Sequence, residues 1–337
     1  MQAAVLRHPG PDLRSAMGAA EVSRPEPARG ELLIDVEACG VCRTDLQLCS
    51  GDLGAHALPV VPGHQIVGRV AAQGEPAGDE PMAPVGTRVG VTWLAGACGD
   101  CRFCMTGREN LCLSATFTGW DRDGGYAEYV CADAAFVHPL PERAGATEIA
   151  PLLCAGVIGY RSLRVAGLGP GSAPGRLGLF GFGASASIVI QVAKHWGLEV
   201  YVCTRSPAEQ SVAMELGAVW AGGFDETPPV ALDAAITTAP VGRSISNAVR
   251  ALDRGGIVAV NAIHLDEVPR MDYDDLWWER QIRSVANVTR RDSREFLELA
   301  TSIPVTTIRV ERPLAEAVDA LEDLAAGKVD GSVVLTP

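Results

Sequence analysis

Four cysteines fall within the stretch CGDCRFCMTGRENLC, from residue 98 to residue 112. Their spacing, Cys-x2-Cys-x2-Cys-x7-Cys, differs from the common bacterial iron–sulfur run, in which the last gap is three residues. Disulfides are disfavoured, because cysteines two residues apart pair poorly without strain. Four thiolates at this spacing suit tetrahedral zinc and leave no open coordination position. We therefore predict a closed, structural zinc site on Cys98, Cys101, Cys104 and Cys112.

A second group of candidate metal ligands is spread over three stretches that lie far apart in the sequence. The stretch CGVCRTD contains Cys42, PGHQIVG contains His64, and the apolar LLCAGVIGY contains Cys154. Two thiolates and one imidazole form a known catalytic zinc set, in which a fourth position is left for water or substrate. Taken singly, His64 is more often a structural histidine and Cys154 more often a small buried apolar residue. The residue types alone leave both interpretations open.

The stretch GLFGFGASA has the pattern of a dinucleotide-binding turn. Gly181, Gly183 and Ala186 form Gly-x-Gly-x-x-Ala, which alone is a weak signal because glycine-rich turns are common. Here the pattern follows an apolar strand and opens a helix, whose N-terminal amides can hold a pyrophosphate. Alanine in the third place suits close packing of the helix on the strand. We therefore predict that these three residues bind a dinucleotide.

The end of the next strand distinguishes NAD from NADP. An NAD site usually ends this strand with Asp or Glu, which binds the ribose hydroxyls. Here YVCTRS ends with Thr204, Arg205 and Ser206 and contains no carboxylate. Arg205 can make a charge-assisted contact with a 2′-phosphate, and the two hydroxyls can add hydrogen bonds. We predict NADP rather than NAD; the alternative is that Ser206 only caps the next helix and Arg205 is a solvated surface charge.

The elements that must position these residues change character along the chain. Up to about residue 150 the sequence is typical of short strands and turns. From Arg176 onward apolar strands alternate with helices, which favours a parallel sheet covered on both faces. After about residue 285 the chain continues with a helix, a strand, a helix and a final strand, a tail that could rejoin the first domain. We predict an α/β protein with a β-rich domain and a doubly wound parallel-sheet domain.

Composition and charge narrow the class of protein. A chain of 337 residues with 47% hydrophobic and 20% charged residues is long enough for two globular domains. No apolar run reaches the roughly 18 residues of a membrane span, and the N-terminus lacks a signal-peptide core, so we expect a cytoplasmic protein. The net charge of −13 argues against nucleic acid or an anionic membrane as partner, since both need clustered Lys and Arg.

The chain resembles the zinc-dependent medium-chain alcohol dehydrogenases, within the medium-chain dehydrogenase/reductase superfamily, over nearly its full length. The stretches that carry the resemblance, in the family's order, are CGVCRTDL, PGHQIVG, CGDCRFCMTGRENLC, DGGYAEYV, LLCAGVIGY and GFGASA. The resemblance implies a GroES-like zinc-binding catalytic domain over residues 1–150 and 288–337, and a Rossmann dinucleotide-binding domain over residues 151–287. It implies one catalytic zinc on Cys42, His64 and Cys154, besides the structural zinc. The implied reaction transfers a hydride between NADP(H) and a primary alcohol or its aldehyde.

The resemblance also implies roles for residues beside the metal ligands. Thr44 corresponds to the first proton acceptor from the substrate oxygen, and Asp45 to a carboxylate that accepts the other ring N–H of His64. Without the family, Thr44 and Asp45 fit equally well as caps of the following helix. Arg43 stands where the family often places a basic residue on the cofactor pyrophosphate.

Two pairs of tryptophans are candidates for a substrate cleft and for a subunit interface. Trp93 resembles an aromatic residue that lines the substrate cleft of family members acting on small alcohols, and we expect Trp120 to line the same cleft. Plain core packing explains both almost as well, because large aromatics are usually buried for structural reasons. Trp277 and Trp278 stand near the family's subunit contacts, where either an interface or a loop packed on its own sheet would explain them. We predict a homo-oligomer, either a dimer or a tetramer.

Two positions depart from the family's pattern. Many relatives carry Glu where this chain has Gln65, and a proton-relaying His where it has Gln47. Neither change removes a zinc ligand, so we retain Gln65 among the active-site residues. Both changes leave open a reductase of the same fold that acts on an activated carbon–carbon double bond. The sequence is also compatible with an alcohol dehydrogenase that prefers NAD(H), and with a zinc-stabilised module without catalysis.

Overall fold

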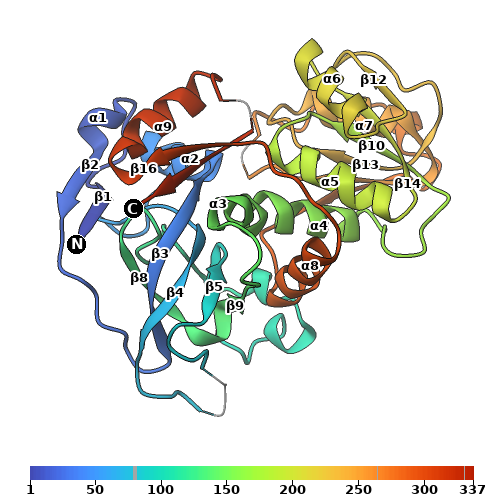
Figure 1. Cartoon of the computed structure of the whole chain (residues 1–337). Helices are drawn as coiled ribbons and strands as arrows, with labels where there is room; N and C mark the ends of the chain where they lie inside the picture. The colour runs from blue at the N-terminus through green and yellow to red at the C-terminus, as the bar shows by residue number, and fades with distance from the viewer. Residues whose placement is uncertain (79–81, 264, 330) are drawn as a thin grey trace. The chain divides into compact units, whose positions relative to one another are not determined.

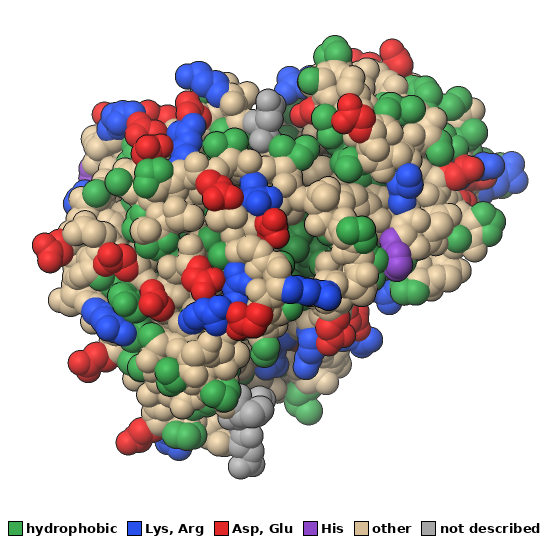
Figure 2. All heavy atoms as spheres, viewed as in Figure 1, with side chains coloured by type: hydrophobic (Ala, Val, Ile, Leu, Met, Phe, Trp, Pro, Cys, Tyr) green, Lys and Arg blue, Asp and Glu red, His purple; other side chains and the backbone are tan. Residues whose placement is uncertain are grey.

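The computed structural model describes residues 1–78, 82–263, 265–329 and 331–337, which form two compact units (Figure 1). Unit 1 comprises Met1–Cys154, Asn287–Thr301 and Thr307–Pro337, and unit 2 comprises Ala155–Ala286 and Ser302–Thr306. Within these described ranges, no helix is both long and apolar enough to cross a bilayer. Basic side chains are interspersed with acidic ones over the face shown in Figure 2.

A largely antiparallel sheet forms the centre of unit 1. Its order is β16-β17-β3-β4-β5-β9, and β8 pairs with the first half of β3 while β17 pairs with the end of β3. The C-terminal strand therefore completes the sheet that the N-terminal half begins. The strands are β3 (Glu31–Val41), β4 (Gln65–Gln73), β5 (Arg88–Val91), β8 (Tyr129–Asp133), β9 (Val137–Pro139), β16 (Arg309–Pro313) and β17 (Ser332–Thr336).

Short elements cover this sheet or extend from it. The core beneath them is apolar, with Leu32, Ile34 and Ile66 completely buried. Two small antiparallel sheets pair β1 (Gln2–Leu6) with β2 (Met17–Glu21), and β6 (Leu94–Gly96) with β7 (Thr116–Phe117). The helices are α1 (Leu13–Ala16), α2 (Arg43–Ser50), α3 (Ala146–Ile149), α8 (Arg290–Ser302) and α9 (Ala317–Ala325). The last residue of α8, Ser302, is assigned to unit 2.

Unit 2 contains a six-stranded parallel sheet in the order β12-β11-β10-β13-β14-β15. The first strand, β10, lies inside the sheet; the chain adds β11 and β12 on one side of it and then β13, β14 and β15 on the other. This reversal is the doubly wound topology, which places a ligand crevice at the carboxyl ends of β10 and β13. The strands are β10 (Arg176–Phe180), β11 (Glu199–Cys203), β12 (Trp220–Gly222), β13 (Leu232–Thr237), β14 (Leu252–Val260) and β15 (Gln281–Ser284).

Helices connect several successive strands of unit 2: α5 (Ala184–His195) joins β10 to β11, α6 (Pro207–Glu215) joins β11 to β12, and α7 (Arg243–Ala251) joins β13 to β14. Helix α4 (Ala155–Val165) precedes β10. Ser206 is the N-cap of α6, the role that the sequence offered beside phosphate binding, and Pro207 stands in the first helical position. The α/β fold class, with a GroES-like β-rich part and a Rossmann parallel sheet, is confirmed.

A buried histidine in β9 makes the stability of unit 1 depend on pH. Burial, together with the charges of Arg294 and Arg290, lowers the pKa of His138 from 6.5 to about 4. Between pH 6.5 and 4 the unfolded chain therefore binds a proton that the folded chain does not, and stability is lost as the pH falls through that window. At pH 5 the loss attributable to His138 is about 2 kcal/mol relative to pH 7.5.

Urea denaturation of the wild type and of His138→Gln at both pH values measures this contribution. The wild type should lose about 2 kcal/mol more than the variant on going from pH 7.5 to pH 5. His8→Gln, at an exposed position, serves as the matched control and should follow the wild type. Equal losses in the wild type and His138→Gln would show that the histidine is not held neutral.

Candidate active site

Three segments of unit 1 bring Cys42, His64 and Cys154 together. Cys42 follows β3 and is the N-cap of α2, His64 immediately precedes β4, and Cys154 follows a 3-10 helix over Ala150–Leu153. The Sγ atoms of Cys42 and Cys154 are 3.8 Å apart, and Nε2 of His64 is 3.4 Å from Sγ of Cys154. One ligand atom from each residue lies within 4.8 Å of the others, so one ion can contact all three.

The chemistry of these three donors fits zinc with an open position. The Cys154 thiol donates to Cys42 and holds the pKa of the Cys42 thiol well below its usual range, and His64 acts in the same direction against the effect of burial. Burial lowers the pKa of His64, but Asp45 and Cys42 outweigh it and raise that pKa to about 10. The negative charge of the sulfur pair thus lies on Cys42, because the hydrogen bond to Cys42 and burial raise the pKa of Cys154 well above its usual range.

Asp45 links the ligands to one another. It is 2% exposed, and its Oδ1 accepts hydrogen bonds from Nδ1 of His64 at 3.0 Å and from the backbone N–H of Gly63 at 3.2 Å. Its Oδ2 accepts from the backbone N–H of Cys42 at 2.8 Å. The carboxylate therefore caps helix α2 and contacts the histidine at the same time, so the two interpretations of Asp45 open at the level of sequence are both present in the fold.

Other residues expected at the site lie around this centre. The Thr44 hydroxyl is half-buried, 3.6 Å from Sγ of Cys42, and Arg43 is exposed at the start of α2. Gln65 is buried in the first position of β4, where its amide packs over Gly40: a Cβ at Gly40 would lie 2.6 Å from Oε1. Gln47 is buried in α2, and its Oε1 has no hydrogen-bond partner among the described residues.

Trp93 and Trp120 belong to one cluster of rings beside the histidine ligand. The ring centroid of Trp93 is 6.0 Å from that of His64 and 5.7 Å from that of Trp120, on which it is stacked. Two residues that sequence reasoning missed complete the cluster. Phe117 lies 4.8 Å from Trp93, and His56 stacks at 3.9 Å on Trp120, centroid to centroid. No local pattern signals either residue, because these contacts join separate segments of the chain.

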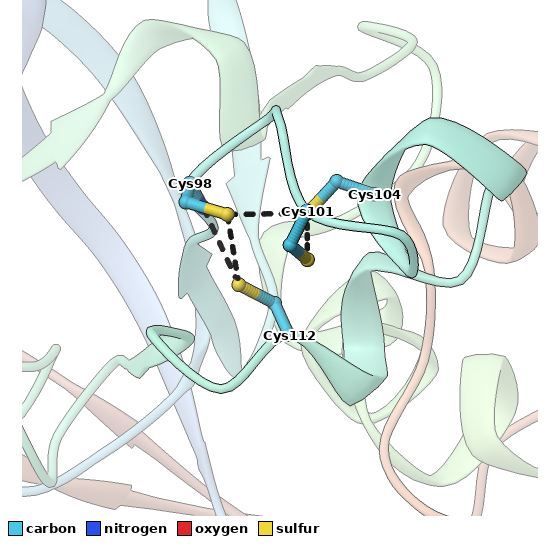
Figure 3. A group of neighbouring side chains, drawn as sticks. All are labelled: Cys98, Cys101, Cys104 and Cys112. Carbon is cyan, nitrogen blue, oxygen red and sulfur yellow. Dashed lines mark hydrogen bonds between the residues drawn. The ribbon is translucent and has the colours of Figure 1, made fainter.

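The four-cysteine group converges in a loop between β6 and β7 (Figure 3). The Sγ atoms of Cys98 and Cys112 are 3.4 Å apart, and those of Cys101 and Cys104 are 3.6 Å apart. All four sulfur atoms lie within 4.8 Å of one another, so one tetrahedral zinc ion fits between them. The two cysteine groups are separate donor sets, one closed and one open.

The glycine-rich turn of unit 2 lies between β10 and α5. Gly181 has φ +96°, and a Cβ there would lie 2.8 Å from the backbone nitrogen of Ala239, so only glycine fits. Gly183 is the N-cap of α5, and a Cβ at this residue would meet no atom within 4 Å, which leaves its amide approachable. Ala186 is completely buried in the first turn. This arrangement suits a pyrophosphate at the helix N-terminus.

The loop after β11 holds Arg205 between two residues that are already engaged. The Thr204 hydroxyl donates to the Glu209 carboxylate, and the Ser206 hydroxyl accepts from the backbone N–H of Glu209 at 3.3 Å. Arg205 is exposed, and within the described part of the chain it has no ion pair. Strand β11 ends without a carboxylate of its own, but helix α6 places the Glu209 carboxylate beside the end of this strand. Neither Glu209 as a site residue nor this contact was identified from the sequence.

Alcohol dehydrogenases are among the proteins to which the chain is similar. The family model described as "Alcohol dehydrogenase GroES-like domain" matches residues 28–142. Over 340 residues the chain is 48% identical to "Probable alcohol dehydrogenase AdhA" of Mycobacterium tuberculosis (strain CDC 1551 / Oshkosh), covering 99% of this chain and 97% of that protein. The chain belongs to the zinc-containing medium-chain alcohol dehydrogenase family.

Two further relatives agree with this assignment. An "Alcohol dehydrogenase" of Geobacillus stearothermophilus is 35% identical over 344 residues, with 99% of this chain and 98% of that protein covered. The cobalt- and zinc-bound thermostable alcohol dehydrogenase of Pyrobaculum aerophilum superposes with a TM-score of 0.88 at 26% identity, covering 100% of this chain and 99% of that one.

The protein is therefore a zinc-dependent alcohol dehydrogenase, an oxidoreductase of CH–OH groups with NAD(P) as acceptor. The prediction of the family and of the enzyme class from the sequence is confirmed. The family assignment favours alcohol and aldehyde chemistry over reduction of a carbon–carbon double bond and over a module without catalysis.

Proposed function

We propose that this alcohol dehydrogenase transfers a hydride between NADP(H) and a primary alcohol or its aldehyde. The observation that carries the choice of NADP(H) is Arg205, an exposed guanidinium after β11 with no partner among the described residues. A 2′-phosphate on the adenosine ribose is the group that an arginine at this strand end binds, with up to two charge-assisted hydrogen bonds.

The proposed active-site residues of unit 1 have separate roles in the reaction. Cys42, His64 and Cys154 hold the catalytic zinc, which when bound supplies Lewis acidity toward the substrate oxygen. Asp45 keeps the proton of His64 on Nδ1, so that Nε2 remains free to act as a ligand. The Thr44 hydroxyl, next to the ligand Cys42, accepts the proton of the substrate alcohol. In unit 2 the turn from Gly181 to Ala186 binds the pyrophosphate; the role of Arg43 stays a prediction.

A primary alcohol or aldehyde with an apolar substituent suits the surroundings of His64. Trp93 and Trp120 present a stacked pair of rings close to this ligand, and both are partly exposed. Such rings exclude water from the carbon that exchanges hydride and favour an apolar chain or ring on the substrate. A homo-oligomer stays a prediction; the exposed side chains of Trp277 and Trp278, 56% and 45%, support it.

A second candidate, an enzyme that prefers NAD(H), is favoured by one specific observation. The carboxylate of Glu209 lies against the Thr204 hydroxyl at the end of β11, where NAD sites carry an acidic residue for the ribose hydroxyls. A carboxylate there also repels a 2′-phosphate. The charge of Arg205 thus favours NADP(H) and that of Glu209 favours NAD(H). Because Arg205 is exposed and can reach a 2′-phosphate, we propose NADP(H).

Initial rates with NADPH and with NADH, against a panel of aliphatic and aromatic aldehydes, test the proposal. We expect turnover with a preference for NADPH, and Arg205→Ala should lower kcat/KM for NADPH about 10- to 100-fold with little change for NADH. Arg176→Ala is the matched control, because Arg176 is at the opposite end of the same sheet, in the first position of β10. A preference for NADH, or equal losses with both cofactors, would support the second candidate instead.

A further inference from the structure

The fully buried phenol of Tyr126 contacts the active site of unit 1 without being part of it. Tyr126 is 0% exposed and precedes β8, in the stretch DGGYAEYV. Its hydroxyl donates a hydrogen bond to Oδ2 of Asp45 at 3.1 Å. Burial, and then the charge of Asp45, raise the pKa of Tyr126 well above its usual range, so the hydroxyl keeps its proton and remains a donor. None of the roles assigned above includes this residue.

The hydroxyl completes the hydrogen bonding of the Asp45 carboxylate. Oδ1 accepts from His64 and Gly63, and Oδ2 accepts from the backbone of Cys42 and from Tyr126. Each oxygen thus has two donors, which fixes the rotation of the carboxylate about its Cβ–Cγ bond. Without the phenol, Oδ2 keeps only the contact to Cys42, and the plane of the carboxylate that orients the imidazole is less restricted.

The ring of Tyr126 also supports the loop that carries the histidine. Gly63 has φ +97°, and a Cβ there would lie 2.4 Å from Cδ1 of Tyr126, so the ring lies directly on the backbone before His64. The backbone N–H of Tyr126 donates to the carbonyl of Pro62 at 3.0 Å. Tyr126 therefore touches the ligand loop by its backbone, its ring and, through Asp45, its hydroxyl.

We propose that Tyr126 is a positioning residue for the catalytic metal: through Asp45 it fixes the orientation of the His64 imidazole and so raises the affinity of this site for zinc. The inference rests on the proposed role of Cys42, His64 and Cys154 as ligands of the catalytic zinc. Removing an outer partner of a ligating histidine typically costs 10- to 100-fold in metal affinity. Among the described residues, the hydrogen bonds of the four cysteines and those of Asp45 share no residue.

Tyr126→Phe tests the inference, because it keeps the ring over Gly63 and removes only the hydroxyl. Purified wild type and variant, each loaded with two zinc ions, are titrated with a chelator whose absorbance reports the zinc released. We expect the catalytic zinc, whose release is marked by the loss of turnover, to leave Tyr126→Phe at a roughly tenfold lower chelator concentration, and the zinc of the four-cysteine site to leave at the wild-type concentration. Tyr129→Phe is the matched control, because the Tyr129 ring stacks on Arg24 at 4.0 Å and its hydroxyl has no described partner.

A double-mutant cycle with Asp45→Asn shows whether the phenol acts through the carboxylate. If it does, the two substitutions together weaken zinc binding by less than the product of their separate effects. Release of the catalytic zinc at the wild-type chelator concentration, or equal weakening of both sites, would overturn the role of Tyr126. If the wild type keeps its turnover after both zinc ions have been released, the proposed catalytic site is wrong instead, so the two failures are distinct.

Discussion

Cys154→Ser is expected to fold like the wild type, to bind one zinc ion instead of two, and to lose at least about a thousandfold in kcat/KM. Serine is nearly isosteric with cysteine, but its hydroxyl does not ionise to an anionic ligand near neutral pH as a thiol beside a metal does. With Cys154 replaced, Cys42 and His64 remain as only two strong ligands. Loss of the metal's Lewis acidity removes several kcal/mol of transition-state stabilisation.

Three measurements on the same preparation check this result: zinc content by mass spectrometry, the melting curve, and initial rates of aldehyde reduction. Cys131→Ser is the matched control, because Cys131 lies in β8 of the same unit and belongs to neither metal-binding group. The control should keep both zinc ions and wild-type rates. Wild-type turnover in Cys154→Ser, with the zinc content reduced to one, would sink the assignment of this site to catalysis.

The parts of this protein that sequence predicts are those encoded locally. The four cysteines lie within one short loop, so their spacing alone indicates a closed zinc site. The glycine turn and the N-cap Ser206 are likewise read from a few neighbouring residues, and the alternation of apolar strands with helices gives the parallel sheet of unit 2. Each signal reports a constraint on backbone or ligand geometry that acts over a single turn or element.

The parts that sequence does not predict are contacts between distant segments. Tyr126 meets Asp45 across 81 positions of the chain, and His56 meets Trp120 across 64, without any periodicity that links the partners. Glu209 shows the same difficulty at short range: its place in the first turn of α6 indicates capping, and only the fold brings its carboxylate to the Thr204 hydroxyl. Registers between strands and the paths of loops decide such contacts, and both depend on the whole packed core.

The loop that carries the four cysteines should depend on its metal for structure. It contains only two single-turn 3-10 helices, Cys104–Thr106 and Glu109–Leu111, and its apolar side chains Met105 and Leu113 are 77% and 94% exposed. A segment with so little buried apolar surface has no core of its own to offset the entropy of ordering it. Zinc supplies that free energy in small metal-bound folds, which unfold when it is removed.

Cys101→Ser is therefore expected to lose the zinc ion of the four-cysteine site and to lower the melting temperature of the protein by roughly 10 °C. The catalytic site should be spared, because Cys42, His64 and Cys154 lie on other segments, so turnover per folded molecule at low temperature should stay close to wild type. Differential scanning calorimetry and the zinc content measure the loss of stability and of metal. Initial rates at about 15 °C, divided by the folded fraction, measure turnover per folded molecule. Cys131→Ser again serves as control. An unchanged melting curve would mean that other contacts hold the loop in place. The backbone N–H of Arg290 donates a hydrogen bond to the Glu109 carboxylate at 3.0 Å, and this contact would be the next to remove.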